Sequence, residues 1–145
     1  MDSIVIRRLK AEDAEGIGKI DEAITKISGK FDLERFVAEQ AQRGGDASFV
    51  AEHEGRVVGF MICFITTGNF GVERCAWIGM LGVDPKYMDH GIGKRMAEEI
   101  FRFCKEKGIK DIFTSVRWDS TDLLSFFKIL GFDRSNFINL RRILE

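Results

Sequence analysis

Apolar residues recur along this chain with two different spacings, and the changes from one spacing to the other mark its elements. Alternating apolar and polar positions, and a short apolar run near the start, predict strands, because successive side chains of a strand point to opposite faces. The predicted strands cover residues 4–6, 48–52, 56–66, 74–83, 111–118 and 137–144. Apolar residues three and four positions apart predict helices. The predicted helices cover residues 11–25, 31–43 and 92–107, and a last helix begins at Asp119 or Ser120 and ends at Gly131.

The order of these elements predicts the fold class. The order β-α-α-β-β-β-α-β-α-β is typical of an α/β fold whose mixed sheet has helices on both faces. Turns are predicted at residues 28–30, 54–55 and 69–71, and Gly108 follows the most amphipathic helix, as a residue that ends helices. No repeat, low-complexity tract or linker interrupts the sequence, so we expect one domain over residues 1–145.

Composition narrows the classes of function. A chain of 145 residues that is 45% hydrophobic can bury a core without disulfides or a metal. Its 22 Lys and Arg residues against 23 Asp and Glu residues leave a formal charge of −1. Non-specific nucleic-acid binders carry a strong positive field, so we expect no nucleic-acid partner. The basic pair Arg141 and Arg142 is interpreted as solvated surface.

The remaining composition indicates the compartment. Cys63, Cys75 and Cys104 show no paired spacing, which favours buried thiols in a reducing compartment. His53 and His90 belong to no metal-spaced cluster, so no metal is expected. The sequence lacks an apolar stretch of about 18 residues and lacks the pattern of a signal peptide. We therefore expect a cytoplasmic protein that does not enter a membrane.

One segment carries a chemical signal. A predicted strand, a short loop and the most amphipathic predicted helix follow one another, and Gly91 and Gly93 open the helix. The first turn of a helix has unpaired N–H groups and positive potential, and glycines let a phosphate approach them. Lys94 and Arg95 add cationic side chains. The alternative is a tight turn without a ligand. A dinucleotide-binding motif would need glycine at Met96, and a phosphate loop would need Ser or Thr at Arg95.

This segment resembles a known family. The run Val83-Asp-Pro-Lys-Tyr-Met-Asp-His-Gly-Ile-Gly-Lys looks like the acyl-CoA pyrophosphate loop of GNAT acetyltransferases. Residues 123–132 resemble the second signature of that family, a helix that ends in Gly-Phe. The predicted element order also matches along nearly the whole chain. The resemblance implies a mixed, mostly antiparallel sheet and transfer of an acetyl group from acetyl-CoA to a primary amine, by direct attack in a ternary complex.

The resemblance also implies a set of cofactor-binding residues. The strand before the loop would offer backbone groups to the pantetheine arm, and the loop would cradle the pyrophosphate. The strand residues are Leu81, Gly82 and Val83, the loop residues are Met88, Asp89, His90, Gly91, Ile92, Gly93 and Lys94, and Ser120 and Phe127 occupy positions of the second signature. The thioester would lie where the strand of Leu81 splays from the strand of Ser115, and Gly79 and Gly82 are compatible with a bulge there.

Several positions depart from the family pattern. Met88 stands where relatives usually carry Gln or Arg, and Ser120 stands in place of a common Asn. Phe127 replaces the Tyr that protonates the departing thiolate in many relatives, and Phe cannot donate a proton. Trp77 and Gly79 are inert where some relatives place a base. These departures motivate an alternative reading, a catalytically idle acyl-CoA-binding or regulatory module.

Glu73 is our candidate base, acting through water. Strand alternation would place it on one face of residues 74–83 with Cys75, Trp77, Gly79 and Leu81. The alternative is a solvated residue at the entry of a strand.

The sequence does not identify the acceptor. The first two helices, about residues 17–36, would wall the acceptor site, where acidic side chains could attract an amine. These side chains are Asp21, Glu22, Asp32 and Glu34. A small amine, a peptide N-terminus, a lysine side chain and an antibiotic all fit, and a homodimer is possible. A nucleotide-binding domain that uses the same loop is a third reading.

Overall fold

The computed structural model describes residues 3–25, 32–42, 47–68 and 73–145. The chain divides into two compact units, Met1–Ser115 and Val116–Glu145. The first unit holds the sheet with helices α1, α2 and α3, and the second holds helix α4. The turns predicted at residues 28–30 and 69–71 lie outside the described residues, and the expectation of one domain stays a prediction.

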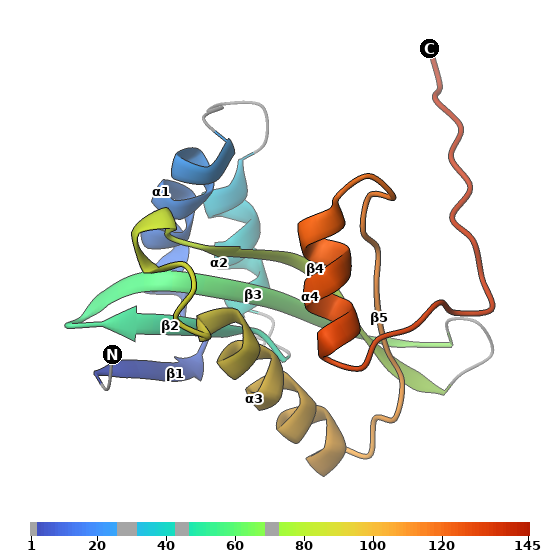
Figure 1. The fold of residues 1–145 in the computed structure, drawn as a ribbon, viewed down its shortest axis with the longest axis horizontal. Coiled ribbons are helices and arrows are strands. Elements are labelled where there is room, and N and C mark those ends of the chain that lie inside the picture. The colour runs from blue at the N-terminus through green and yellow to red at the C-terminus, as the bar shows by residue number, and fades with distance from the viewer. Residues whose placement is uncertain (1–2, 26–31, 43–46, 69–72) are drawn as a thin grey trace. The chain divides into compact units, whose positions relative to one another are not determined.

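A five-stranded sheet forms the centre of the first unit, in the spatial order β1-β2-β3-β4-β5 (Figure 1). The strands are β1 Ile4–Arg8, β2 Phe49–His53, β3 Arg56–Thr67, β4 Arg74–Val83 and β5 Ile112–Thr114. Strands β1 to β4 pair antiparallel, and β5 pairs parallel to β4. Glu54 and Gly55 both have positive φ, which makes the tight turn between β2 and β3. The expected mixed, mostly antiparallel sheet is therefore confirmed.

Helices cover both faces of this sheet (Figure 1). Helix α1 covers Ala14–Thr25 after a short 3-10 helix, η1 Ala11–Asp13, and α2 covers Leu33–Gln42. Their buried faces form one apolar cluster with side chains of the central strands. Its members include Ile17, Ile20, Leu33, Val37, Val50, Phe60 and Ile62. Helix α3, Ile92–Glu106, packs on the opposite face.

Helix α3 approaches the sheet closely at Gly59 of β3. A Cβ built on Gly59 would lie 3.2 Å from Ile92 and 3.2 Å from Met96, both on α3. Glycine at this position therefore lets the first turns of the helix rest almost on the strand backbone. At its other end α3 finishes as the sequence predicts, because Gly108 has φ 76° and Ile109 N–H donates to the carbonyl of Cys104.

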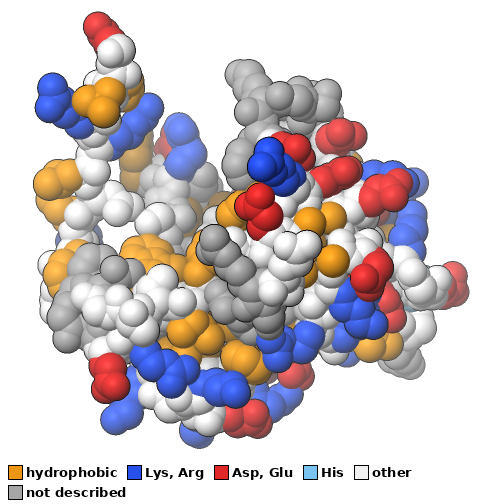
Figure 2. All heavy atoms as spheres, turned by 180° about the vertical axis from the view of Figure 1, so that it is seen from behind, with side chains coloured by type: hydrophobic (Ala, Val, Ile, Leu, Met, Phe, Trp, Pro, Cys, Tyr) orange, Lys and Arg blue, Asp and Glu red, His pale blue; other side chains and the backbone are white. Residues whose placement is uncertain are grey.

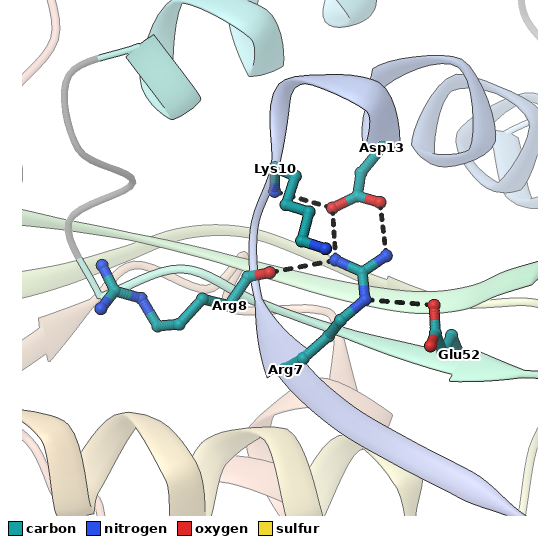
Figure 3. Close-up of polar contacts among 5 residues, drawn as sticks. All are labelled: Arg7, Arg8, Lys10, Asp13 and Glu52. Carbon is teal, nitrogen blue, oxygen red and sulfur yellow. Dashed lines mark hydrogen bonds and ion pairs between the residues drawn. The ribbon is translucent and has the colours of Figure 1, made fainter. Parts of the chain in front are cut away.

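A polar network joins β1, η1 and β2 at the edge of the first unit (Figure 3). The guanidinium of Arg7 binds both carboxylate oxygens of Asp13, at 2.7 and 3.0 Å, and Glu52 at 3.1 Å. Asp13 is buried and also accepts from the backbone N–H of Lys10 at 2.8 Å. The two carboxylates hold the pKa of Arg7 above its ordinary value, chiefly through the hydrogen bonds to Asp13. A buried carboxylate is thereby fully paired.

The second unit contains α4, Thr121–Ile129, followed by residues without regular structure. Helix α4 ends at Gly131, whose φ is 97° and whose N–H donates to the carbonyl of Lys128. Phe127 is buried and makes edge-on ring contacts with Phe126 and Phe132, both at 5.1 Å between centroids. The helix and its glycine stop were predicted, and both are confirmed.

The prediction of a last strand over residues 137–144 is wrong. These residues form no strand, and the sheet has five strands where six were expected. Ile138 and Leu140 are 83% and 87% exposed. An alternating apolar pattern measures only the propensity of side chains for a sheet, whereas a strand also needs a neighbour for its backbone groups. The sequence pattern contains no information about that neighbour.

Charged side chains of both signs are interspersed on the face drawn in Figure 2, with apolar side chains between them. Helix α3, with 15 residues, is too short and too polar to cross a bilayer, and the same holds for every other helix within the described ranges.

Candidate functional site

The segment between β4 and α3 begins with a tightly bonded turn at Asp84. Its backbone N–H donates to the carbonyl of Val58 on β3 at 2.8 Å. Its carboxylate accepts from the N–H of Lys86 at 3.0 Å, and its carbonyl accepts from the N–H of Tyr87 at 2.7 Å. These bonds build a short 3-10 helix, η3 Pro85–Tyr87, and fix the start of the segment against the sheet.

The first turn of α3 leaves its backbone donors open. Gly91 is the residue before the helix and adopts a left-handed conformation, with φ 72°, and no side chain caps the helix. The first backbone hydrogen bond of the helix runs from Arg95 N–H to the carbonyl of Gly91 at 3.1 Å. The N–H groups of Ile92, Gly93 and Lys94 come before this bond and are therefore unpaired within the helix. Three adjacent donors at a positive helix end suit an anion.

The residues that lead to these donors are exposed. A Cβ built on Gly91 would meet no atom within 4 Å. Met88 is 56% exposed, and Asp89, with φ 66°, His90 and Lys94 are exposed beside it. Of the loop residues named from the sequence, residues 88–91 and Lys94 are exposed, Gly93 is half-buried, and the side chain of Ile92 is buried.

The sequence suggested that the Arg95 side chain adds positive charge to the anion site, but the structure gives this side chain a backbone partner on β1. Its guanidinium donates to the backbone carbonyl of Ile4 at 3.0 Å. The side chain therefore ties the start of α3 to β1. Lys94, which is exposed, is the cation of this pair that remains beside the open donors.

Strand β4 carries the bulge that the glycines indicated. In the pairing with β3, Ile62 opposes Met80 and Cys63 opposes Ile78, so that Gly79 is the extra residue. A Cβ on Gly79 would lie 2.5 Å from Phe64, and one on Gly82 would lie 2.8 Å from Phe60. Packing alone therefore favours glycine at both positions.

The pairing of β4 with β5 ends just before this bulge. The register runs from Ala76 opposite Ile112 to Ile78 opposite Thr114, and the Thr114 hydroxyl donates to the carbonyl of Ile78 at 2.9 Å. Within the described ranges, no strand pairs with residues 79–83 on the edge that faces away from β3. The backbone groups on that edge of residues 79–83 are therefore not bonded to another described strand, and the stretch leads on to the loop.

The bulge changes which side chains of β4 share a face. Trp77 pairs with Phe64 and Leu81 pairs with Met61, and residues 61 and 64 point to opposite faces of β3. The expectation that Trp77 and Leu81 share one face is therefore wrong, because simple alternation does not hold across an inserted residue.

Glu73 lies at the other end of β4 from the loop. It is exposed and directly precedes the first strand residue. Gly79 lies six positions further along the chain, which at the rise of a strand is roughly 20 Å. The structure thus does not bring Glu73 together with the loop residues.

Ser120 and Phe127 belong to the second unit. Ser120 is the residue before α4, and its side chain makes no capping bond. Asp119 is instead held by Arg117 through two hydrogen bonds of 2.9 Å, and this pair keeps the pKa of the Asp119 carboxyl below its ordinary value. Phe127 contributes a buried ring to the unit's own packing.

All three cysteines are buried, as predicted. The Cys75 thiol lies 3.2 Å from the hydroxyl of Thr66. The neighbouring Cys63 thiol lowers the pKa of Cys104, and Arg74 adds to this effect against the opposing influence of burial. Thiols buried in a packed core are poor nucleophiles. No group of three or more potential metal ligands occurs within the described part of the chain.

Sequence reasoning missed one cluster beside the loop. The hydroxyl of Tyr87 contacts His53 at 2.9 Å and Arg56 at 3.0 Å. More than 30 positions separate Tyr87 from these residues, so no local motif could reveal the contact. The signal that was present is the tight turn at residues 54–55, which makes His53 and Arg56 strand partners.

Solved structures of similar fold include two acetyltransferases. The crystal structure of an aminoglycoside acetyltransferase, meta-AAC0020, from an uncultured soil metagenomic sample in complex with trehalose aligns with a TM-score of 0.82 at 21% identity. It covers 99% of this chain and 98% of that protein. The structure of AAC(6')-Iy in complex with a bisubstrate analogue, CoA-S-monomethyl-acetylneamine, aligns with a TM-score of 0.79 at 17% identity, over 97% and 98% of the two chains.

Sequence relatives carry acetyltransferase names as well. Mycothiol acetyltransferase of Amycolatopsis mediterranei is 33% identical over 92 residues, which is 61% of this chain and 31% of that protein. The enzyme of the same name from Saccharomonospora viridis is 26% identical over 132 residues, 80% of this chain and 43% of that protein. This chain thus spans less than half the length of either relative.

The match to the family model extends far beyond the loop between β4 and α3. The model of the acetyltransferase (GNAT) family covers residues 17–132, from α1 past the end of α4. This range contains the bulged β4, η3 and the open N-terminus of α3. The chain belongs to the acetyltransferase (GNAT) family.

Proposed function

We propose that this protein is an acyl-CoA-dependent N-acyltransferase that transfers an acetyl group from acetyl-CoA to a primary amine. One observation carries the proposal: an uncapped N-terminus of α3, opened by a left-handed glycine, follows the bulged strand β4 after η3 and a short exposed loop, and no described strand pairs with the end of β4 on its outer edge. A helix end suits a pyrophosphate, and a free strand edge suits the amide groups of a pantetheine arm. Acetyl-CoA contains both groups in one molecule.

The proposed residues follow from this arrangement. Leu81, Gly82 and Val83 would hold the pantetheine arm through their backbone. The pyrophosphate would lie on the turn formed by Met88, Asp89, His90, Gly91, Ile92, Gly93 and Lys94. Backbone groups do most of this binding, so Met88 in place of a polar residue does not abolish it. Ser120 and Phe127 stay predictions as cofactor contacts.

The proposed reaction is a direct transfer. The neutral amine attacks the thioester carbonyl carbon, an N–H of the bulged strand stabilises the oxyanion, and the C–S bond breaks as the amide forms. The amine gives up one proton, and the CoA thiolate gains one. Glu73 is our proposed proton acceptor, and at roughly 20 Å from Gly79 along the strand it would need a chain of several waters to receive the proton. Replacing Glu73 by Gln should lower kcat at least tenfold without changing the KM for acetyl-CoA, and an unchanged kcat would contradict this role.

The acceptor is proposed only as a primary amine. Proteins with related sequence or fold are named mycothiol acetyltransferase, N-alpha-acetyltransferase, aminoglycoside acetyltransferase and ribosomal-protein-alanine N-acetyltransferase. These names support an acceptor that presents an amine. Acidic side chains on α1 and α2 would attract its protonated form before reaction. They are Asp21 and Glu22 on α1, and Asp32 and Glu34 at the start of α2.

The test measures CoA release from acetyl-CoA over a panel of amino sugars, peptide N-termini and lysine peptides. We expect turnover on at least one acceptor class.

Gly93→Asp should abolish acetyl-CoA binding, because it puts a carboxylate where phosphate would lie. The substitution should not unfold the protein, since acidic residues are favourable in the first turn of a helix. Gly93→Asn is the matched control, because it adds the same bulk without the charge. Equal affinity in wild type and Gly93→Asp would overturn the assignment of the loop.

A second function is favoured by the absence of acid and base groups at Phe127, Trp77 and Gly79. The protein would then bind acyl-CoA as a catalytically idle or regulatory module. Binding of acetyl-CoA without turnover on any acceptor of the panel would support this reading against the first. Competition of ATP and NAD with acetyl-CoA tests the nucleotide-binding reading. A cytoplasmic location and a homodimer also stay predictions.

A further inference from the structure

The hydroxyl of Tyr87 is held between two side chains of the hairpin formed by β2 and β3. His53 Nδ1 lies 2.9 Å from the phenol oxygen, and Arg56 Nη2 lies 3.0 Å from it. The His53 and Tyr87 rings meet edge-on with centroids 5.4 Å apart, and the Arg56 guanidinium carbon lies 5.7 Å from the centre of the phenol ring. We refer to these three residues as the Tyr87 clamp.

The chemistry of the groups fixes the direction of the hydrogen bond between Arg56 and Tyr87. A guanidinium can only donate, so the Tyr87 oxygen accepts from Arg56. Towards His53 the phenol either donates to a lone pair of Nδ1 or accepts from an N–H there, according to the tautomer of the ring. His53 Nε2 lies 3.9 Å from the carboxylate of Glu54. Each member of the clamp thus has a distinct and replaceable role.

The clamp lies at the last anchored point before the open turn. Tyr87 ends η3, and its N–H donates to the carbonyl of Asp84. The next three residues, 88–90, are exposed and lead to Gly91. No side-chain hydrogen bond of residues 88–91 occurs within the described part of the chain. The direction in which the loop leaves the sheet is therefore set at Tyr87.

We propose that Tyr87 is a positioning residue for acetyl-CoA: its hydroxyl, held by His53 and Arg56, keeps the loop in the orientation that presents the α3 donors to the pyrophosphate. This inference rests on the proposed function. Tyr87 touches no reacting atom in this account. Because Tyr87 holds the loop in place, less conformational freedom is lost when the cofactor binds. Tyr87 therefore affects the affinity for acetyl-CoA and not the rate of the chemical step.

The experiment replaces Tyr87 by Phe and measures acetyl-CoA affinity by calorimetry, together with KM and kcat. Phenylalanine keeps the ring contacts and removes only the oxygen. The loss of a hydrogen-bond network of this size should raise the Kd and the KM for acetyl-CoA by roughly three- to tenfold. The kcat at saturating acetyl-CoA should stay unchanged. Circular dichroism and the Tm establish that the variant is folded.

A matched pair at His53 tests the mechanism of the clamp. His53→Asn keeps a side-chain amide that can accept or donate near the position of Nδ1, whereas His53→Leu removes the hydrogen-bonding group. We expect His53→Asn to stay close to wild type and His53→Leu to match Tyr87→Phe. The double variant should bind no more weakly than either single variant, because both remove the same hydrogen bond.

Three results would overturn the proposal. Wild-type affinity in Tyr87→Phe would show that the hydroxyl does not position the loop. Equal affinities in the two His53 variants would exclude the hydrogen bond as the cause. A wild-type protein that does not bind acetyl-CoA at all would contradict the proposed function itself, and the clamp as a cofactor device would fail with it.

Discussion

Gly79 occupies a position where the structure leaves no room for a side chain. A Cβ there would lie 2.5 Å from Cε2 of Phe64, and Phe64 is itself packed edge-on against Phe36 at 5.8 Å. We expect Gly79→Ala to lower the free energy of unfolding by about 1–3 kcal/mol, because the aromatic pair must shift. Urea denaturation monitored by fluorescence measures this change.

Gly18 provides the matched control for that substitution. A Cβ on Gly18 would lie 2.9 Å from Oε1 of Glu34, which is the end of a flexible side chain. Glu34 can rotate away, and alanine is favoured over glycine inside a helix by roughly 1 kcal/mol. Gly18→Ala should therefore be as stable as wild type or more stable. Gly79→Ala without any loss of stability would show that the bulge adapts to a side chain.

A substitution at Phe127 can distinguish two explanations for its ring: it replaces a catalytic tyrosine, or it packs in the core. Its ring is buried between Phe126 and Phe132. In Phe127→Tyr, a hydroxyl without a partner should cost about 1–3 kcal/mol of stability, with little gain in kcat. Melting temperature and turnover are measured on the same preparation. An unchanged Tm with a tenfold higher kcat would instead show that the thiolate lacks its proton donor in the wild type.

At the scale of elements, the Arg7 network holds β1, η1 and β2 together. Arg7→Met would leave the buried carboxylate of Asp13 without its cation, and breaking a buried ion pair typically costs 3–5 kcal/mol. Because the Arg7 side chain is 23% exposed, we expect a smaller loss, roughly 2 kcal/mol. Chemical denaturation checks the value.

Arg35 offers the comparison for Arg7, because it pairs with Glu39 on α2 with both side chains largely exposed. Exposed pairs of this kind contribute about 0.3–0.5 kcal/mol. Arg35→Met should therefore change the stability little. Equal losses in the Arg7 and Arg35 variants would contradict a structural role for the network.

The sequence predicted those elements whose pattern is local. The helices from α1 to α4, the hairpin turn at Glu54 and Gly55, and the glycine stops at Gly108 and Gly131 depend on neighbouring residues, and all are present. The same holds for the open turn at Gly91. Features that depend on distant partners were missed or misjudged. The Tyr87 clamp joins residues far apart in the chain, and the face of Leu81 depends on a register shift between β3 and β4.

At the scale of the whole molecule, the two units differ in how their backbone is bonded. The first unit has a paired sheet, whereas most residues after α4 lack regular structure. We expect amides of β3 to exchange with solvent slowly, and amides of residues 137–144 to exchange rapidly. Hydrogen exchange with mass spectrometry measures both. Protection of residues 137–144 comparable to that of β3 would show that they pair as a strand, as their alternating pattern predicted.

Acetyl-CoA should change this exchange pattern in one place. Amides in the first turn of α3 should become protected when the cofactor is added, because the phosphates would accept their hydrogen bonds. Protection that is absent from residues 91–95 at saturating acetyl-CoA would contradict the assigned binding mode.

The open first turn of α3 has a consequence for how such proteins diverge. A binding surface made of peptide N–H groups is inherited with the path of the chain, and most substitutions leave it intact. Side chains around it can drift during evolution, since only a residue that blocks the approach or alters the turn removes the donors. A search for a catalytic arrangement of side chains would not find this chain. A search for a left-handed glycine before an uncapped helix, after a bulged strand, would find it.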